Sequence, residues 1–250
     1  MPEFTGKTVL ITGGGSGIGL ATARRVIAGA GQVVLAGRNA DRLAMAAKDL
    51  DAGGRVLTVP TDVSRPDQLD DLAARVRDRF GSLQGVVANA GEGLNAATAD
   101  VTEDDFDRIV GTNFKGVFFT VQRSLPLLTE GAGVVLVSSW LAHRGMATGS
   151  LYAATKAAVA NLAQTLAPDL AQRGVRVNTV TPGHIRTEMF DAMTGNDQVR
   201  EFFRSQVPLG RLGDPADIAD AVAYLLSPAS AYVSGQELVV DGGLVRSVPA

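Results

Sequence analysis

Short apolar runs, rich in β-branched residues, recur along the chain and alternate with stretches of helical periodicity. The runs are 8–12, 32–36, 55–59, 85–88, 134–138, 175–180 and 237–240. Between them, stretches such as 67–76 place apolar residues three and four apart, the spacing of an amphipathic helix. Strands that alternate with helices form parallel sheets, and strands that are apolar throughout are covered on both sides. The sequence predicts an α/β fold, a doubly wound parallel sheet of about seven strands with helices on both faces.

The length of the chain and its uniform composition favour one domain. A chain of 250 residues suits one large α/β domain or two small ones, and no repeat or flexible linker divides it. We therefore expect residues 1–250 to form a single domain. The segment 184–208 carries apolar side chains among polar ones. It is a candidate substrate lid, and a peripheral helix packed as ordinary core is an equally good interpretation.

Composition excludes several classes of function. A net charge of −3, with Lys and Arg scattered, predicts no surface for nucleic acid or anionic membrane. Cysteine is absent, and His143 and His184 lie far apart, so no metal site is expected. Residues 1–7 lack a signal-peptide pattern, and no apolar run approaches the roughly 18 residues of a transmembrane helix. We expect a soluble cytoplasmic protein.

A glycine-rich turn follows the first predicted strand. It reads Thr12-Gly13-Gly14-Gly15-Ser16-Gly17-Ile18-Gly19 and leads into a helical stretch. Glycines let the backbone approach a pyrophosphate, and a helix N-terminus supplies free N–H groups and a partial positive charge. The spacing departs from the strict G-x-G-x-x-G pattern. The strand-turn-helix context nevertheless predicts a Rossmann-like dinucleotide site that uses Gly13, Ser16, Gly17, Ile18 and Gly19.

The end of the second predicted strand indicates which dinucleotide binds. NAD enzymes usually place an acidic residue there, about 20 residues beyond the glycines, to bind the ribose 2′-hydroxyl. Here Gly37 stands in that place with Arg38 beside it, and a guanidinium attracts a 2′-phosphate. NADP(H) is therefore favoured, with NAD(H) as the alternative. Arg38 as a plain surface cation, and Asp41 as a ribose partner, stay open.

Tyr152 and Lys156 stand four residues apart in a run of good helix formers, so both project from one helical face. A free tyrosine has a pKa of about 10, and a neighbouring cation favours the phenolate. We expect Lys156 to lower the pKa of Tyr152 toward neutral, where the phenol can act as a general acid or base. Such a pair also occurs by chance on solvated helices, so further motifs have to support it.

A series of motifs, met in order over residues 7–243, resembles the short-chain dehydrogenase/reductase family. The motifs are the turn 12–19 (T-G-x-x-x-G-I-G), Asp62-Val63, Asn89-Ala90-Gly91, Asn113, Ser139 before Tyr152, Tyr152 to Lys156 (Y-x-x-x-K) and Pro182-Gly183-x-Ile185-x-Thr187. The resemblance implies an enzyme that transfers a hydride between a nicotinamide cofactor and a carbonyl or secondary alcohol.

The resemblance also implies a role for each motif. At the reacting centre, Ser139 would bind the substrate carbonyl, Tyr152 would exchange the proton, Lys156 would lower the phenol pKa and hold the nicotinamide ribose, and Asn113 would position a water in a proton relay. Around the cofactor, Asp62 and Val63 would contact adenine, Asn89, Ala90 and Gly91 would line the ribose side, and Pro182, Gly183, Ile185 and Thr187 would close over the nicotinamide. Ser138 is interpreted as a decoy beside Ser139.

Several residues carry plainer interpretations. Without the motifs, Asn113 would be a helix cap or kink and Asn89 a satisfied turn residue. Glu92 and His143 are interpreted as exposed loop residues, with a place at the edge of the pocket as the alternative. Residues 103–107 are interpreted as a solvated helix start. Trp140 is bulkier than the residue that the family often has after the serine. It would narrow the pocket, stack on a planar substrate, or pack in the interior.

Motif position places four apolar residues near the site: Leu94, Met146, Met189 and Phe190. We therefore expect a ketoreductase that acts on an apolar or cyclic ketone rather than a charged sugar. The alternatives are an NAD-linked secondary alcohol dehydrogenase, an epimerase that retains its cofactor, and a non-catalytic dinucleotide sensor or scaffold. The intact Ser139, Tyr152, Lys156 and Asn113 disfavour the sensor. The resemblance further implies a homotetramer, or a homodimer, assembled through the helices that match 113–128 and 152–170.

Overall fold

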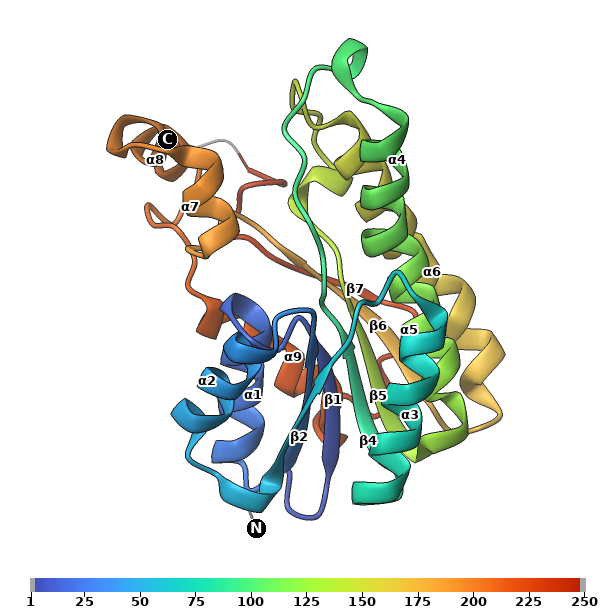
Figure 1. Ribbon diagram of the computed structural model, residues 1–250. Coiled ribbons are helices and arrows are strands. Elements are labelled where there is room, and N and C mark those ends of the chain that lie inside the picture. Colours follow the sequence, from blue (N-terminus) through green and yellow to red (C-terminus); the bar gives the residue numbers. More distant parts are fainter. Residues whose placement is uncertain (1–2, 248–250) are drawn as a thin grey trace.

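The computed structural model describes residues 3–247 and contains a parallel sheet of seven strands in the order β3-β2-β1-β4-β5-β6-β7 (Figure 1). The strands are β1 (Thr8–Thr12), β2 (Gln32–Gly37), β3 (Val56–Pro60), β4 (Leu83–Ala88), β5 (Leu128–Val137), β6 (Arg176–Pro182) and β7 (Glu237–Val240). All seven predicted strands are confirmed. The largest difference is in β5, which begins at Leu128, ahead of the apolar run that marked it.

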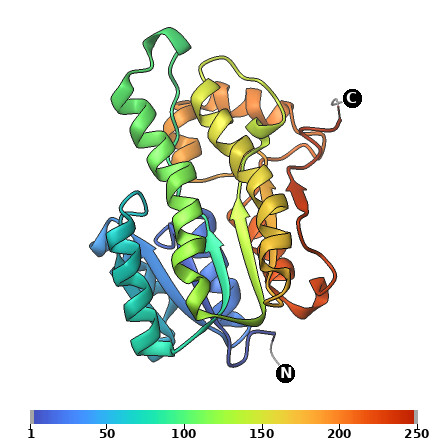
Figure 2. The same cartoon turned by 90° about the vertical axis from the view of Figure 1, so that its right-hand side faces the viewer.

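Helices cover both faces of the sheet, as predicted. One face carries α1 (Gly17–Ala28), α2 (Ala40–Leu50) and α9 (Pro215–Leu226), and the other carries α3 (Pro66–Phe80), α5 (Gly116–Ser124) and α6 (Ser150–Ala171). Figure 2 looks onto the second of these layers, where α5 and α6 run side by side. Successive strand residues point to opposite faces. Val33 and Leu35 therefore join one core and Val34 joins the other.

The remaining helices rise beyond the carboxyl ends of the strands. Thr102 and Asp105 form a capping box at the start of α4 (Glu103–Val110), which confirms the predicted helix start. A π turn, Gly111–Lys115, joins α4 to α5. The segment 184–208 folds into α7 (Glu188–Thr194) and α8 (Asp197–Ser205). In Figure 1, α7 and α8 lie on the opposite side of the view from α4.

The strand order indicates where along the sheet a ligand would bind. The chain leaves β1 toward β2 on one side, and it later returns to pair β4 on the other side of β1. In open α/β sheets, ligands bind outside the carboxyl ends of the strands at such a reversal. No helix among residues 3–247 is long and apolar enough to cross a membrane.

The turn after β1 is built from glycines because its backbone segments touch. Gly13 has a φ of +67°, a conformation that glycine adopts without strain. A Cβ on Gly19 would lie 2.2 Å from the carbonyl oxygen of Gly13. The first turn of α1 is therefore pressed directly against the end of β1.

Gly19→Ala should destabilise the fold, because the added methyl group meets backbone rather than a movable side chain. We expect a loss of about 3 kcal/mol in unfolding free energy, measured by chemical denaturation. Gly145→Ala is the matched control, since no atom of the described chain beyond the two adjacent residues lies within 4 Å of a Cβ there. Equal losses in the two variants would contradict the close approach at Gly19.

Candidate active site

Ser139, Tyr152 and Lys156 meet beyond the carboxyl end of β5. Ser139 directly precedes a short 3₁₀ turn, Trp140–Ala142, while Tyr152 and Lys156 lie in the first two turns of α6. The Ser139 side chain hydrogen-bonds the Tyr152 phenol. The Lys156 ammonium lies 5.8 Å from the centroid of the Tyr152 ring. Two hydroxyl groups and one cation thus converge at one point, as the sequence predicted.

Lys156 is held inside the protein, with only 4% of its surface exposed. Its Nζ donates a hydrogen bond of 2.9 Å to the carbonyl oxygen of Val137, the last residue of β5. Ser138 Oγ donates in turn to the Lys156 carbonyl oxygen at 2.8 Å. Ser138, interpreted as a decoy, therefore ties α6 to the end of β5. Burial disfavours the charged ammonium and lowers the pKa of Lys156 to about 8.

The pKa of Tyr152 departs from the sequence-based expectation. Burial of the phenol raises the pKa of Tyr152, because the phenolate would lose its hydration, and the hydrogen bond with Ser139 acts in the opposite direction. The expected lowering of the Tyr152 pKa by Lys156 is therefore wrong in direction. Tyr152 holds its proton at neutral pH, which is the state of a general acid.

Asn113 lies in the π turn and is fully buried. Its Oδ1 accepts a 2.8 Å hydrogen bond from the backbone N–H of Glu92, and its Nδ2 donates to the Glu92 carbonyl oxygen at 2.9 Å. Nδ2 also donates to Thr155 Oγ1 at 3.4 Å. π turns inside α-helices frequently mark functional sites. Here the side chain fixes the loop after β4 against α6.

That loop passes very close to the ammonium. A Cβ on Gly91 would lie 3.4 Å from Asn113 Oδ1 and 3.4 Å from Lys156 Nζ, at the near limit of ordinary van der Waals contact. Glycine at this position lets the backbone lie against both groups. Gly91, predicted on the ribose side of the cofactor, is therefore also a neighbour of Lys156.

The glycine-rich turn has the features of a phosphate cradle. Ser16 occupies the N-cap of α1, and no capping hydrogen bond to its side chain is found within the described chain, so the first N–H groups are left for an anion. Thr187 Cγ2 would lie 3.4 Å from a Cβ on Gly17. The turn that includes Gly13, Ser16, Gly17, Ile18 and Gly19 is therefore open to a pyrophosphate and bordered by Thr187.

Asn89 and Ala90 support the cradle from the neighbouring strand. Asn89 Nδ2 donates to the Thr12 carbonyl oxygen at 2.9 Å, and Thr12 Oγ1 accepts from the N–H groups of Asn89 and Ala90 at 3.0 and 3.1 Å. The turn after β1 and the loop after β4 are thus locked together. The threonine hydroxyl is a supporting group whose role the sequence pattern did not indicate.

The residues on the adenosine side differ in how far they fit their predicted contacts. Asp62 Oδ1 accepts hydrogen bonds from the backbone and hydroxyl of Ser64, at 2.9 and 2.7 Å. The Val63 side chain is buried and faces Gly116 in the core, so only its backbone is available for the predicted contact with adenine. Arg38 has 63% of its side chain exposed and forms an ion pair with Glu92.

Glu92 was interpreted as an exposed loop residue, and that interpretation is wrong. Only 16% of its side chain is exposed, because it lies between Arg38 and Arg108. His143 is exposed as expected, and its Nε2 lies 2.7 Å from Glu237 Oε1. Residues 3–247 contain no cluster of three or more His, Cys, Asp or Glu side chains suited to a metal ion.

The segment predicted to close over the nicotinamide follows β6, next to β5 and Ser139. Pro182 ends the strand, and the Gly183 N–H donates to the Val240 carbonyl oxygen at 3.1 Å. Ile185 is buried. Thr187 caps α7 by accepting a 3.2 Å hydrogen bond from the Phe190 N–H. The segment and Ser139 follow neighbouring parallel strands, β6 and β5, and so lie at the same edge of the sheet.

Trp140 packs in the interior, one of the three outcomes that the sequence left open. Its ring centroid lies 4.8 Å from that of His184, which in turn lies 4.7 Å from Phe203 of α8. Phe190 of α7 completes this buried aromatic cluster, 5.6 Å from Phe203. Burial lowers the pKa of His184 to about 4, so the imidazole is neutral. The cluster joins the segment 184–208 to the residue that follows Ser139.

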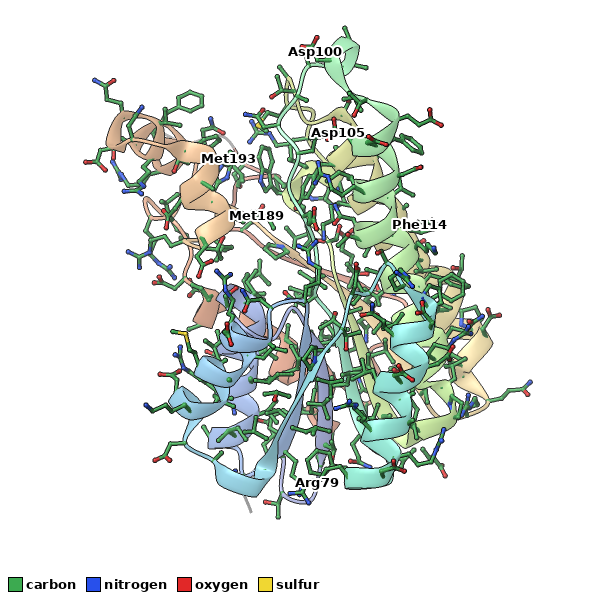
Figure 3. The ribbon with its side chains drawn as sticks, in the orientation of Figure 1. Arg79, Asp100, Asp105, Phe114, Met189 and Met193 are labelled. Carbon is green, nitrogen blue, oxygen red and sulfur yellow. The ribbon has the colours of Figure 1, made fainter. Side chains whose placement is uncertain are left out.

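Phe190 is therefore part of the core rather than free to line a pocket. Met189 is 47% exposed, and Met193 is also exposed. Both lie on α7, whereas Asp105 lies on α4 on the other side of the view (Figure 3). The Met189 side chain would contact a Cβ on Gly93, in the loop after β4, at 3.7 Å. The segment thus reaches toward the loop that carries Gly91 and Glu92.

Comparisons with known proteins agree with this geometry. The family model described as "Enoyl-(Acyl carrier protein) reductase" matches residues 13–245. The chain is 37% identical to the 3-oxoacyl-[acyl-carrier-protein] reductase FabG of Thermotoga maritima, over 97% of this chain and 99% of the relative.

Solved structures agree with the same assignment. A short-chain dehydrogenase/reductase of Brucella melitensis, described as a glucose/ribitol dehydrogenase, superposes with a TM-score of 0.94 at 33% identity, covering 98% of this chain and 99% of that one. Levodione reductase superposes with a TM-score of 0.93 at 32% identity and the same coverage. The chain belongs to the short-chain dehydrogenase/reductase family, and it is an NAD(P)-dependent oxidoreductase.

Proposed function

We propose that the protein reduces a ketone with NADPH, or oxidises the matching secondary alcohol with NADP⁺. The observation that carries the proposal is the hydrogen-bonded Ser139 and Tyr152 pair beside the buried Lys156 ammonium. An oxygen that accepts from both hydroxyl groups would lie where charge develops when a carbonyl is reduced. The phosphate cradle and the segment after β6 flank this point, as a nicotinamide dinucleotide requires.

A nicotinamide cofactor, held by the glycine-rich turn and the segment after β6, would supply the hydride in reduction and accept it in oxidation. Ser139 donates a hydrogen bond to the substrate oxygen and orients the carbonyl. Tyr152 gives its proton to the same oxygen, since its raised pKa keeps it protonated at neutral pH. Lys156, with a pKa of about 8, is mostly cationic at pH 7 and stabilises the phenolate left behind.

Asn113 has its side chain fully engaged with Glu92 and Thr155. In the proposed proton relay, its backbone carbonyl in the π turn would therefore hold the water that reaches Lys156. Glu92, Gly91 and Thr155 act on the relay by fixing the positions of Asn113 and Lys156.

The surface around the site supports the proposed substrate class. Met189 and Met193 are exposed and apolar, and Met189 reaches the loop after β4. These side chains favour an apolar or cyclic ketone, and residues 184–208 would form the lid over it. The levodione reductase among the structural neighbours supports a ketone substrate.

We extend the proposal to a single cytoplasmic domain that assembles as a homotetramer, or a homodimer, through α5 and α6. The resemblance to the family is the main support. α5 and α6 also lie side by side at the outer surface of their layer (Figure 2). The lack of cysteine fits a reducing compartment.

Tyr152→Phe should lower NADPH-dependent ketone turnover by roughly a hundredfold or more, because the proton donor is removed. The dissociation constant for NADPH should stay within about twofold, since the phenol hydroxyl is not needed to hold the phosphates. Stopped-flow absorbance with a panel of cyclic and acyclic ketones measures turnover, and fluorescence titration measures binding. Tyr232→Phe, at a fully exposed tyrosine, is the control.

Three outcomes of that experiment separate the alternatives. A wild-type protein that binds NADPH yet reduces none of the panel would favour a sensor or scaffold. Substrate conversion with no net NADPH consumption would favour an epimerase. Turnover in Tyr152→Phe equal to that of the wild type would contradict the assigned proton donor.

Arg38→Ala should weaken NADP⁺ binding roughly tenfold to a hundredfold, because a charge-assisted contact to the 2′-phosphate is lost. NAD⁺ binding should change little, since the 2′-hydroxyl does not need a guanidinium. Isothermal titration calorimetry with both cofactors measures the two affinities. Arg24→Ala, which removes an exposed arginine of α1 that pairs with Asp49 of α2, is the control. An unchanged preference in Arg38→Ala would favour the NAD-linked alternative or another phosphate ligand.

Burial of Lys156 makes stability depend on pH in a defined direction. The folded-state pKa of about 8 lies below the unfolded value of about 10.4. Between these values the unfolded chain binds more protons, so the unfolding free energy should rise as the pH increases from about 8 to 10. Lys156→Met should lose this rise, and Lys48→Met on α2 should keep it. Denaturant titrations at several pH values measure the slope, and identical slopes in the three proteins would contradict the burial argument.

A further inference from the structure

Glu92 is a largely buried carboxylate held between two arginines. Arg38 Nη1 forms an ion pair with its Oε1, and Arg108 Nη1 donates to its Oε2 at 2.7 Å. Oε1 is itself buried, and it accepts no well-aligned hydrogen bond from any residue that the structure describes. The contact with Arg38 is therefore an attraction between charges without a directed hydrogen bond, which another anion can replace.

The Glu92 backbone is anchored independently of Arg38. Its N–H and its carbonyl oxygen both bond to the Asn113 side chain, at 2.8 and 2.9 Å. The preceding Gly91 lies against Lys156 Nζ. Arg108 holds the carboxylate from the other side. If Arg38 turned away, the Glu92 carboxylate would thus stay close to where it is now.

The ion pair crosses the adenosine side of the predicted cofactor groove. Arg38 follows the last residue of β2, and Glu92 lies in the loop after β4. β1 lies between these two strands in the sheet, and the glycine-rich turn follows β1 (Figure 1). The pair therefore spans the carboxyl end of β1, past the turn that would hold the cofactor phosphates.

We propose that Glu92 is a specificity-determining residue that competes with the cofactor 2′-phosphate for Arg38 and so narrows the preference for NADP(H) over NAD(H). This rests on the proposed function, in which Arg38 binds that phosphate. The Glu92 carboxylate pairs with the Arg38 guanidinium, which is the group that would meet the 2′-phosphate. A 2′-phosphate has to displace or share this partner, and it is also repelled by the anchored carboxylate. A ribose 2′-hydroxyl carries no charge, so it neither competes for Arg38 nor is repelled by the Glu92 carboxylate.

Glu92→Gln tests the proposal because it keeps the size and the backbone anchor and removes the charge. NADP⁺ should bind about fivefold more tightly, the scale of one partly exposed ion pair, while NAD⁺ affinity should change by less than about twofold. The ratio of the NAD⁺ dissociation constant to the NADP⁺ dissociation constant should therefore increase. Asp105→Asn is the matched control. Asp105 pairs with Arg108 at 2.8 Å, as Glu92 does from the other side, but it forms no ion pair with Arg38 among the described residues. Its ratio should equal that of the wild type.

Calorimetric titration of both cofactors separates the possible failures. An unchanged or narrowed ratio in Glu92→Gln, in a protein whose wild type prefers NADP⁺ through Arg38, overturns the role of Glu92 and leaves the proposed function intact. A wild type that binds NAD⁺ more tightly, or an Arg38→Ala variant with an unaltered ratio, overturns the proposed function as well. Should Glu92→Gln fail to fold, Glu92→Asp withdraws the carboxylate from Arg38 and should widen the ratio in the same direction.

Discussion

The hydrogen bond from the Lys156 ammonium to the Val137 carbonyl oxygen is the contact on which the site depends. It joins the end of β5 to the second turn of α6, and Ser138 adds a second bond between the same two elements. Ser139, the residue after Ser138, is thereby placed beside Tyr152. A buried charge is costly unless it is paired or hydrogen-bonded. The protein meets that cost with a backbone carbonyl, and it keeps an ammonium whose pKa lies near the physiological range.

The loop after β4 connects this centre to the residues predicted to bind the cofactor. Asn113 grips both backbone polar groups of Glu92, and Gly91 lies against Lys156 Nζ. Asn89, three residues before Glu92, hydrogen-bonds the Thr12 carbonyl oxygen at the start of the glycine-rich turn. A single short loop therefore fixes the positions of the phosphate cradle, the ammonium and the carboxylate that meets Arg38. A change in one of these groups is expected to shift the positions of the others through the loop backbone.

Much of the fold and of the site could be predicted from the sequence. Buried strands stand out as apolar runs, and the glycine pattern marks a backbone that has to approach closely, as Gly13 and Gly19 do. The sign of the Tyr152 pKa shift could not be predicted, because spacing reveals a neighbouring cation but not the desolvation that outweighs it. The environment of Glu92 depends on Arg38 and Arg108, which only the folded sheet brings together.

The state of the Lys156 ammonium is the central claim, and NMR titration of ¹³Cε-labelled lysine tests it most directly. The lysines of the chain are Lys7, Lys48, Lys115 and Lys156, so the spectrum is simple and the Lys156→Met variant assigns the signal. We predict that the signal missing from the variant titrates with a pKa of about 8. A signal that titrates only at the ordinary lysine value of about 10.4 would contradict the account.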